Sequence, residues 1–73
     1  MEEGENWIVS RRKGGTTEYL GKNQVWHEDK KDAHLMHEEF AKGTINGLQI
    51  VENGRKEADP FRYESEYYKP QSG

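Results

Sequence analysis

The chain has 73 residues, which is enough for one small domain. Only 30% of the residues are hydrophobic and 34% are charged, so the apolar core must be small. Without cysteine, the chain can form neither disulfides nor thiolate zinc sites. No apolar run approaches the roughly 20 residues of a membrane span, and no signal-peptide stretch follows Met1. The sequence therefore predicts a protein of a reducing cytoplasm.

The net charge of -3 comes from 11 Lys and Arg against 14 Asp and Glu, and it is unevenly distributed. Residues 1–9, 27–39 and 57–73 are net acidic, whereas residues 10–26 and 40–56 are net basic. Patches of both signs favour contact with another protein, because opposite charges steer the encounter. A nonspecific nucleic-acid binder usually has a clear basic excess, which this sequence lacks. An ordinary solvated surface would also account for such blocks.

The first half of the chain predicts a β-meander. Residues 1–5 form a flexible acidic start, and residues 6–12 form a strand with period-two alternation. The pair Gly14-Gly15 favours a hairpin turn, because glycine adopts positive φ at little steric cost. Residues 16–20 return as a second strand, and residues 24–26 form a short third strand after a further turn. Three aromatic residues are then available for the buried face: Trp7, Tyr19 and Trp26.

A single helix is predicted over residues 30–42. Asp29 is a good N-cap, and Gly43 is typical of the residue that ends a helix. Such a short helix is not stable alone in water, so it must pack on the sheet. Its apolar stripe follows helical spacing and comprises Ala33, Met36, His37, Phe40 and Ala41.

The remaining chain predicts one more strand and a tail. Residues 48–51 read as a fourth strand, with Leu48 and Ile50 on one side. Residues 57–73 are mostly charged and include two prolines, which predicts a largely disordered C-terminal tail. The predicted fold class is therefore α+β: a small antiparallel β-meander of three to four strands with one α-helix packed on it. The predicted domain covers residues 6–56.

No residue pattern predicts catalysis or metal binding. The histidines His27, His34 and His37 lack the double-histidine-plus-glutamate pattern of metalloproteases. Nucleophilic catalysis needs Ser or Cys beside a held base, but the serines fall in a predicted strand and in the predicted tail. Gly14-Gly15 lacks the ending of a phosphate-binding loop. We therefore expect no enzyme activity, no metal and no cofactor.

Nucleic-acid binding would rest on the basic hairpin, where Arg11-Arg12-Lys13 face Lys22, with aromatic rings as stacking platforms. The same rings supply nearly the whole core, however. If they stacked on bases, little would remain to hold the sheet. Direct nucleic-acid contact is therefore not the expectation.

By elimination, the sequence best fits a monomeric partner-binding module. A short exposed strand invites another chain to pair with it, and exposed cations at the hairpin add charge. The candidate partner-binding residues at the hairpin and sheet edge are Ile8, Arg11, Arg12, Lys13 and Lys22. A second candidate face consists of the helix acids Asp32, Glu38 and Glu39.

The residue order also carries a resemblance. Trp-Ile-Val-Ser-Arg-Arg over residues 7–12, a Gly-Gly pair, Thr-Glu-Tyr-Leu-Gly, Val25-Trp26 and Asp32-Ala33 follow one another. Over roughly residues 6–42 this order resembles small phage-encoded domains. Over the whole chain, the sequence resembles small phage transcription regulators that bind host RNA polymerase, such as that of a Xanthomonas phage.

The resemblance implies a function that composition does not. Proteins of that kind bind bacterial RNA polymerase in the host cytoplasm, inhibit initiation by hindering σ-factor engagement, and can act as antiterminators. No catalysis or metal is implied, and no family motif fixes functional positions. Two other functions stay open: a small nucleic-acid-binding protein that uses the basic hairpin, or a phage inhibitor of another host enzyme, such as a nuclease.

Overall fold

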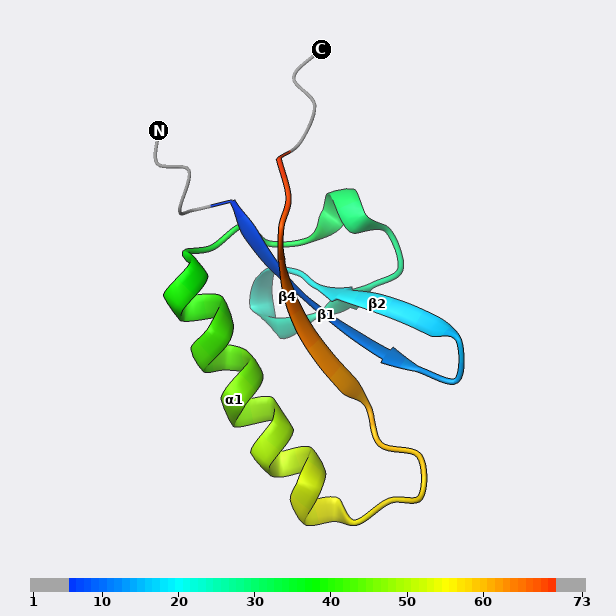
Figure 1. Ribbon diagram of the computed structural model, residues 1–73. Helices are drawn as coiled ribbons and strands as arrows, with labels where there is room; N and C mark the ends of the chain where they lie inside the picture. Colours follow the sequence, from blue (N-terminus) through cyan, green and yellow to red (C-terminus); the bar gives the residue numbers. More distant parts are fainter. Residues whose placement is uncertain (1–5, 70–73) are drawn as a thin grey trace.

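The computed structural model describes residues 6–69 and shows a four-stranded antiparallel sheet beside one long helix (Figure 1). The sheet order is β3-β2-β1-β4, so the first strand lies inside the sheet. The predicted α+β class is confirmed. The elements in chain order are β1 (Trp7–Lys13), β2 (Thr16–Leu20), the 3-10 turn η2 (Lys22–Gln24), β3 (Trp26–His27), the 3-10 turn η3 (Lys30–Asp32), α1 (Glu38–Arg55) and β4 (Arg62–Tyr67).

The predicted hairpin is present where the glycine pair indicated it. Lys13 of β1 pairs with Thr16 of β2, which leaves Gly14 and Gly15 as a two-residue turn. Their φ angles are 58° and 86°. Positive φ at both central residues is what a tight turn between right-handed twisted strands requires. Glycine meets that requirement without the steric penalty of a Cβ.

The helix predicted over residues 30–42 is wrong in its position. Asp29 does act as a cap, accepting a bond of 3.2 Å from the Lys31 amide, but the turn it caps ends at Asp32. The chain then extends, and Met36 exchanges two backbone hydrogen bonds with Trp7, of 2.9 and 2.8 Å. This bridge satisfies backbone groups in an extended form, so it overrides the local preference for helix.

The true helix begins at Glu38 and continues to Arg55, so the fourth strand predicted over residues 48–51 is wrong. Gly43 lies inside the helix and does not end it. Residues spaced three or four positions apart form the helix face that packs on the sheet. The burial of this face compensates for the weak helix propensity of the glycines. This packing face consists of Ala41, Ile45, Leu48 and Glu52.

The fourth strand comes from the segment predicted to be disordered. β4 pairs with β1 along its length, from Trp7 opposite Tyr67 to Arg12 opposite Arg62. The tail prediction is therefore wrong for residues 62–67. The predicted acidic start, residues 1–5, and the last residues, 70–73, lie outside the described part. Within residues 6–69, no helix is long and apolar enough to cross a membrane.

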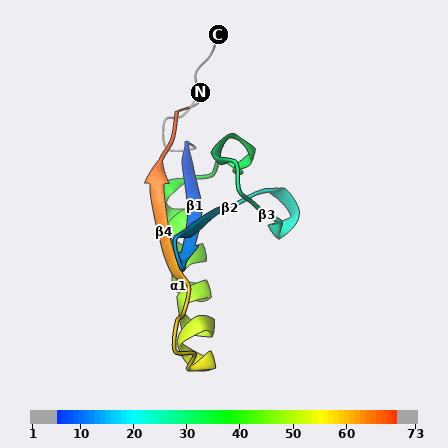
Figure 2. The ribbon, with the colours of Figure 1, turned by 90° about the vertical axis from the view of Figure 1, so that its right-hand side faces the viewer.

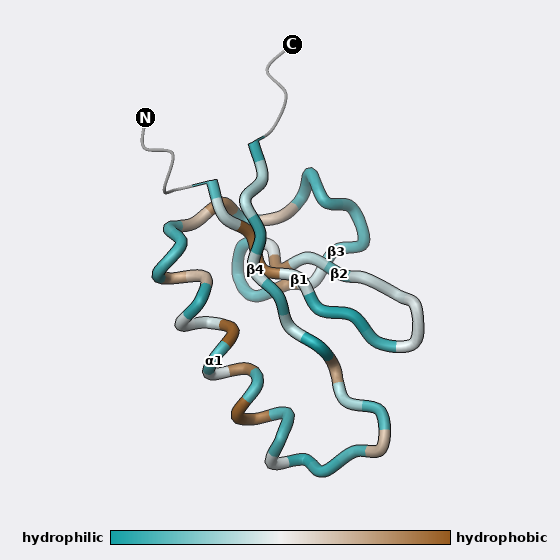
Figure 3. The backbone as a smooth tube through the Cα atoms, in the orientation of Figure 1, coloured by the Kyte–Doolittle hydropathy of each residue, from teal (hydrophilic) through white to brown (hydrophobic). Residues whose placement is uncertain are grey.

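The helix covers one half of one sheet face. α1 packs chiefly against β4 and β1, and β3 lies away from it (Figures 1 and 2). Apolar positions recur along α1 and in β1, separated by hydrophilic ones (Figure 3). The core consists of Val9, Met36 and Ala41, with the half-buried residues Trp7, Leu20, Trp26, Ile45 and Leu48 around it.

The opposite sheet face is also partly covered. Ile8 alternates with Val9 along β1, so the two side chains point to opposite faces, yet both are fully buried. Opposite Ile8 in β4 stands Glu66, and Lys30 of η3 reaches that carboxylate at 3.2 Å. Ile8, predicted to be exposed and partner-binding, is therefore a core residue. That prediction is wrong because both faces of β1 are covered.

We expect Ile8→Val to lower the free energy of unfolding by about 0.5–1.5 kcal/mol, since it removes one methyl group from a closely packed site. Ile50→Val is the matched control, because Ile50 is 62% exposed on the helix. The control should change stability by less than about 0.5 kcal/mol. Urea unfolding of both variants measures this. Equal losses of unfolding free energy in Ile8→Val and Ile50→Val would show that Ile8 is not in the core.

Gly21 closes the loop between β2 and β3 with little room to spare. Its amide donates to the Val25 carbonyl at 2.7 Å. A Cβ built on Gly21 would lie 2.4 Å from Cδ2 of His27 and 3.1 Å from the Val25 carbonyl oxygen. Real atoms cannot approach so closely, so only glycine fits here without displacing the imidazole.

Gly21→Ala should destabilise the fold by about 1–3 kcal/mol, because the methyl group overpacks this loop. In the helix, Gly47→Ala meets nothing within 4 Å and should instead stabilise the protein by about 0.5–1 kcal/mol. Thermal unfolding of the two variants compares them directly. A smaller loss for Gly21→Ala in a His27→Ala background would identify the imidazole as the obstacle.

Candidate binding groove

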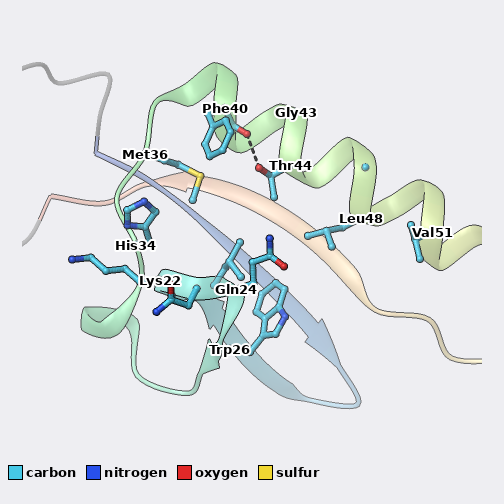
Figure 4. Close-up of a pocket in the computed structure, with 14 residues that line it drawn as sticks. Lys22, Gln24, Trp26, His34, Met36, Phe40, Gly43, Thr44, Leu48 and Val51 are labelled. Atoms are coloured by element: carbon cyan, nitrogen blue, oxygen red, sulfur yellow. Dashed lines mark hydrogen bonds between the residues drawn. The ribbon is translucent and has the colours of Figure 1, made fainter.

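A groove of about 690 Å3 separates α1 from η2 and β3. Thr44 and Leu48 point from the helix toward Gln24 and Trp26 on the other side (Figure 4). The groove exists because α1 packs on the β1–β4 half of the sheet, which leaves apolar side chains of the other half without a cover. The apolar residues that line it are Leu20, Trp26, Met36, Phe40, Leu48 and Val51.

Two large side chains stand exposed at the rim on the helix side. Phe40 and Val51 are each 63% exposed. They are eleven positions apart, which is close to three full helical turns, so they fall on the same side of α1. Large apolar side chains that flank an apolar groove extend the surface a partner can cover.

The charge at the groove is basic. Lys22 belongs to its lining, and no carboxylate lines it among the described residues. Lys22 is exposed and forms no ion pair within residues 6–69. An apolar segment that carries an acidic side chain therefore matches this groove in charge.

The wall opposite the helix contains backbone strain. Asn23 and Gln24 have φ angles of 61° and 60°, in the left-handed region that few residues other than glycine adopt. The loop that holds them is closed by the Gly21–Val25 bond and by a bond of 3.3 Å from the Val25 amide to the Lys22 carbonyl. Strain of this kind concentrates at binding sites, where the surrounding structure maintains it.

Arg11 connects the groove wall to the rest of the sheet. Its guanidinium carbon lies 4.2 Å from the ring centre of Trp26 and 4.2 Å from that of Phe61. Its nitrogens also bond the Glu18 carboxylate on the neighbouring strand, at 2.7 and 2.8 Å. Arg11 therefore has a structural role, while its role as a partner contact stays a prediction, since its side chain is still 22% exposed.

The other predicted basic residues lie at different places in the fold. Lys13 pairs with Glu57 at 3.4 Å and lies 5.0 Å from the Phe61 ring centre. Arg12 is exposed, as predicted, and so is Lys22. These two lie near opposite ends of β2, since Arg12 pairs with Thr17 near its start and Lys22 comes two residues after its last residue. The structure therefore does not bring the predicted set together into one site.

The second candidate face is likewise divided between two elements. Asp32 ends the η3 turn, whereas Glu38 and Glu39 belong to the first turn of α1. Glu38 pairs with Lys42 at 2.9 Å, one helical turn away. The two helix acids favour the start of α1 through the helix dipole. Predicting one helix over residues 30–42 placed all three acids on a common face, and that placement was wrong.

Two of the histidines, His27 and His34, line one common hollow. His27 also lies against Gly21, and His34 also belongs to the groove lining. In the part of the chain that the structure describes, no three side chains of His, Cys, Asp or Glu come together as metal ligands would.

Sequence analysis missed the groove because it assigned Leu48 and Val51 to a strand. Phe40, Thr44, Leu48 and Val51 follow the three- and four-residue spacing of one helix side, and this signal was present in the sequence. Reading Gly43 as a helix end interrupted the pattern.

Searches with family models, curated proteins and solved structures found no match to this chain.

The stack around Arg11 makes a direct prediction. Arg11→Gln should lower the free energy of unfolding by about 1–3 kcal/mol, because it loses two cation–π contacts and an ion pair. Arg12→Gln, the same change one residue on at an exposed position, should change it by less than about 0.5 kcal/mol. Urea unfolding followed by tryptophan fluorescence measures both. If the two variants were equally stable, Arg11 would not have the structural role assigned here.

Proposed function

We propose that this protein binds a protein partner through the groove between α1 and β3, and that the partner is the bacterial RNA polymerase of a phage host. The observation that carries the proposal is the uncovered apolar surface of the groove, flanked by the exposed side chains of Phe40 and Val51. A domain with so few apolar residues gains stability by burying them. Leaving them in contact with water is a cost that a bound partner would remove.

The lining has the composition of a protein-binding surface. Tryptophan, phenylalanine and methionine are enriched where proteins bind one another, and the groove includes Trp26, Phe40 and Met36. Methionine also adapts its shape to different partners. The binding role, with no catalytic step, is therefore the function that this geometry favours.

The choice of RNA polymerase rests on the sequence resemblance to phage transcription regulators. In the proposed mechanism the protein occupies a polymerase surface and hinders σ-factor engagement, which inhibits initiation at host promoters. It acts by binding one state of the enzyme more tightly than another, since a ligand shifts an equilibrium only through such a difference. The same differential binding would account for antitermination.

The structure gives less support to the nucleic-acid alternative. Trp7 packs against the core and against Tyr67, which removes it as a stacking platform for bases. Two cations of the basic triplet, Arg11 and Lys13, are already paired with carboxylates. These pairs leave Arg12 as the exposed cation of the triplet.

The groove assignment is tested with Phe40→Ser and Val51→Ser. Each should weaken binding to purified bacterial RNA polymerase by about tenfold or more, the loss expected for an interface anchor. Ile50→Ser is the matched control, because Ile50 is equally exposed on the helix but does not line the groove. Its affinity should stay within about twofold of the unmodified protein. Titration with nuclease-treated polymerase, together with initiation assays at a σ-dependent promoter, gives both readouts.

Three results would contradict the proposal. Failure to bind nuclease-treated polymerase would remove polymerase as the partner, and recovery of nucleic acid alone would favour the basic-hairpin alternative. If all three serine variants bound the polymerase as tightly as the unmodified protein, the groove would not be the docking surface. Thermal unfolding of each variant must accompany the titration, so that loss of folding is not taken for loss of contact.

A further inference from the structure

Two arginines stand directly opposite each other on the edge pair of the sheet. Arg12 of β1 and Arg62 of β4 are cross-strand partners, and both are exposed. Their side chains point to the same face, because residues opposite each other in an antiparallel pair share a face. This face carries Ile8 and Ser10, so it is opposite to the one that the helix covers.

This arrangement has an electrostatic cost. Like charges directly opposite on neighbouring strands destabilise a sheet, because their Cβ atoms are only about 4.5–5.5 Å apart. Six other cations of the fold meet carboxylates, whereas Lys22, Lys56 and Lys69 do not among residues 6–69; the six are Arg11, Lys13, Lys30, Lys31, Lys42 and Arg55. Neither Arg12 nor Arg62 forms an ion pair with any residue between 6 and 69. Their charges therefore remain available to a ligand.

The two arginines also line a hollow of about 280 Å3 at the end of the sheet. Gly14 and Gly15 also line it, and these two turn residues carry no side chain that could cover the arginines. Asp59 and Pro60, from the loop before β4, complete the lining together with Lys13. Asp59 lines the same hollow but forms no ion pair with either arginine among the described residues, so both guanidinium groups can still bond an added carboxylate directly.

We propose that Arg12 and Arg62 form a clamp that binds carboxylates of an acidic segment on a partner protein. Each guanidinium presents a planar fork of donors that matches a carboxylate, and such bidentate pairs are strong and directional. An incoming carboxylate also relieves the repulsion between the arginines. The clamp is separate from the groove, so an experiment that rules out one of the two binding sites would leave the other proposal unchanged.

The neighbouring charges favour a short acidic segment over a nucleic-acid backbone. Beyond Arg62, the same face of β4 carries Glu64 and Glu66, and Asp59 lies at the other side of the hollow. A phosphate backbone is charged along its length and would run onto these acids, whereas nucleic-acid binders provide a continuous basic track. One or two carboxylates from a peptide require only the clamp itself.

The test is an NMR titration of the full-length protein with a short peptide that carries two adjacent glutamates between uncharged residues, at low and at physiological salt. The expected result is a saturable shift of the side-chain Nε–H signals of Arg12 and Arg62, which weakens as salt rises. Arg12→Gln and Arg62→Gln should each raise the dissociation constant by roughly fivefold or more. Lys31→Gln removes one charge from an exposed site elsewhere and should change it less than about twofold.

Stability measurements separate the clamp from a structural role. Because the two charges repel each other, Arg62→Gln should leave the melting temperature unchanged or raise it, even as binding weakens. Shifts spread evenly over all exposed cations, or equal losses for Lys31→Gln, would reduce the effect to general charge attraction and overturn the proposal. Tighter binding of an eight-nucleotide thymidine strand than of the peptide would also overturn it and assign the arginines to nucleic acid.

Discussion

The guanidinium group of Arg11 is the contact on which the arrangement of this fold depends. It extends from β1 to the Glu18 carboxylate in β2 and to the Trp26 ring in β3. On its other side lies Phe61, whose amide donates at 3.0 Å to Glu52, a helix carboxylate that is only 2% exposed. One cation thus links the sheet to Phe61, and the partly buried bond from the Phe61 amide to Glu52 continues that link to the helix. Such contacts are worth more away from water than on the surface, provided that each partner is satisfied.

This link also explains the shape of the candidate groove. Trp26 is held by Arg11 on the sheet side, while α1 packs over β1 and β4. The apolar residues between them, Leu20 and Leu48 among others, are covered on one side only. A chain with 30% hydrophobic residues cannot cover both the core and this surface. The proposed partner surface therefore arises from the same shortage of apolar residues that keeps the core small.

Local signals in the sequence were reliable where a single residue type meets a local requirement. The glycine pair at the hairpin and the capping role of Asp29 are such cases, and both are present. Local signals gave a wrong prediction where contacts with residues distant in the sequence decide the structure. Residues 62–67 are charged and polar enough to suggest disorder, yet β1 provides them with hydrogen-bond partners and with the face that holds Tyr63 against Trp26. Nothing within the segment itself reveals that partner.

By itself, the sequence determined the α+β class, the β1–β2 hairpin and the small size of the core. These follow from composition, alternation and turn chemistry, which act over a few residues. Tertiary structure alone decided where the helix begins, which segment completes the sheet, and which cations remain accessible. Arg11 and Arg12 are adjacent and chemically identical, yet alternation along β1 directs the first to an aromatic stack and the second toward Arg62. The physical reason is that charge pairing and burial depend on contacts between strands, and these are set only when the whole sheet assembles.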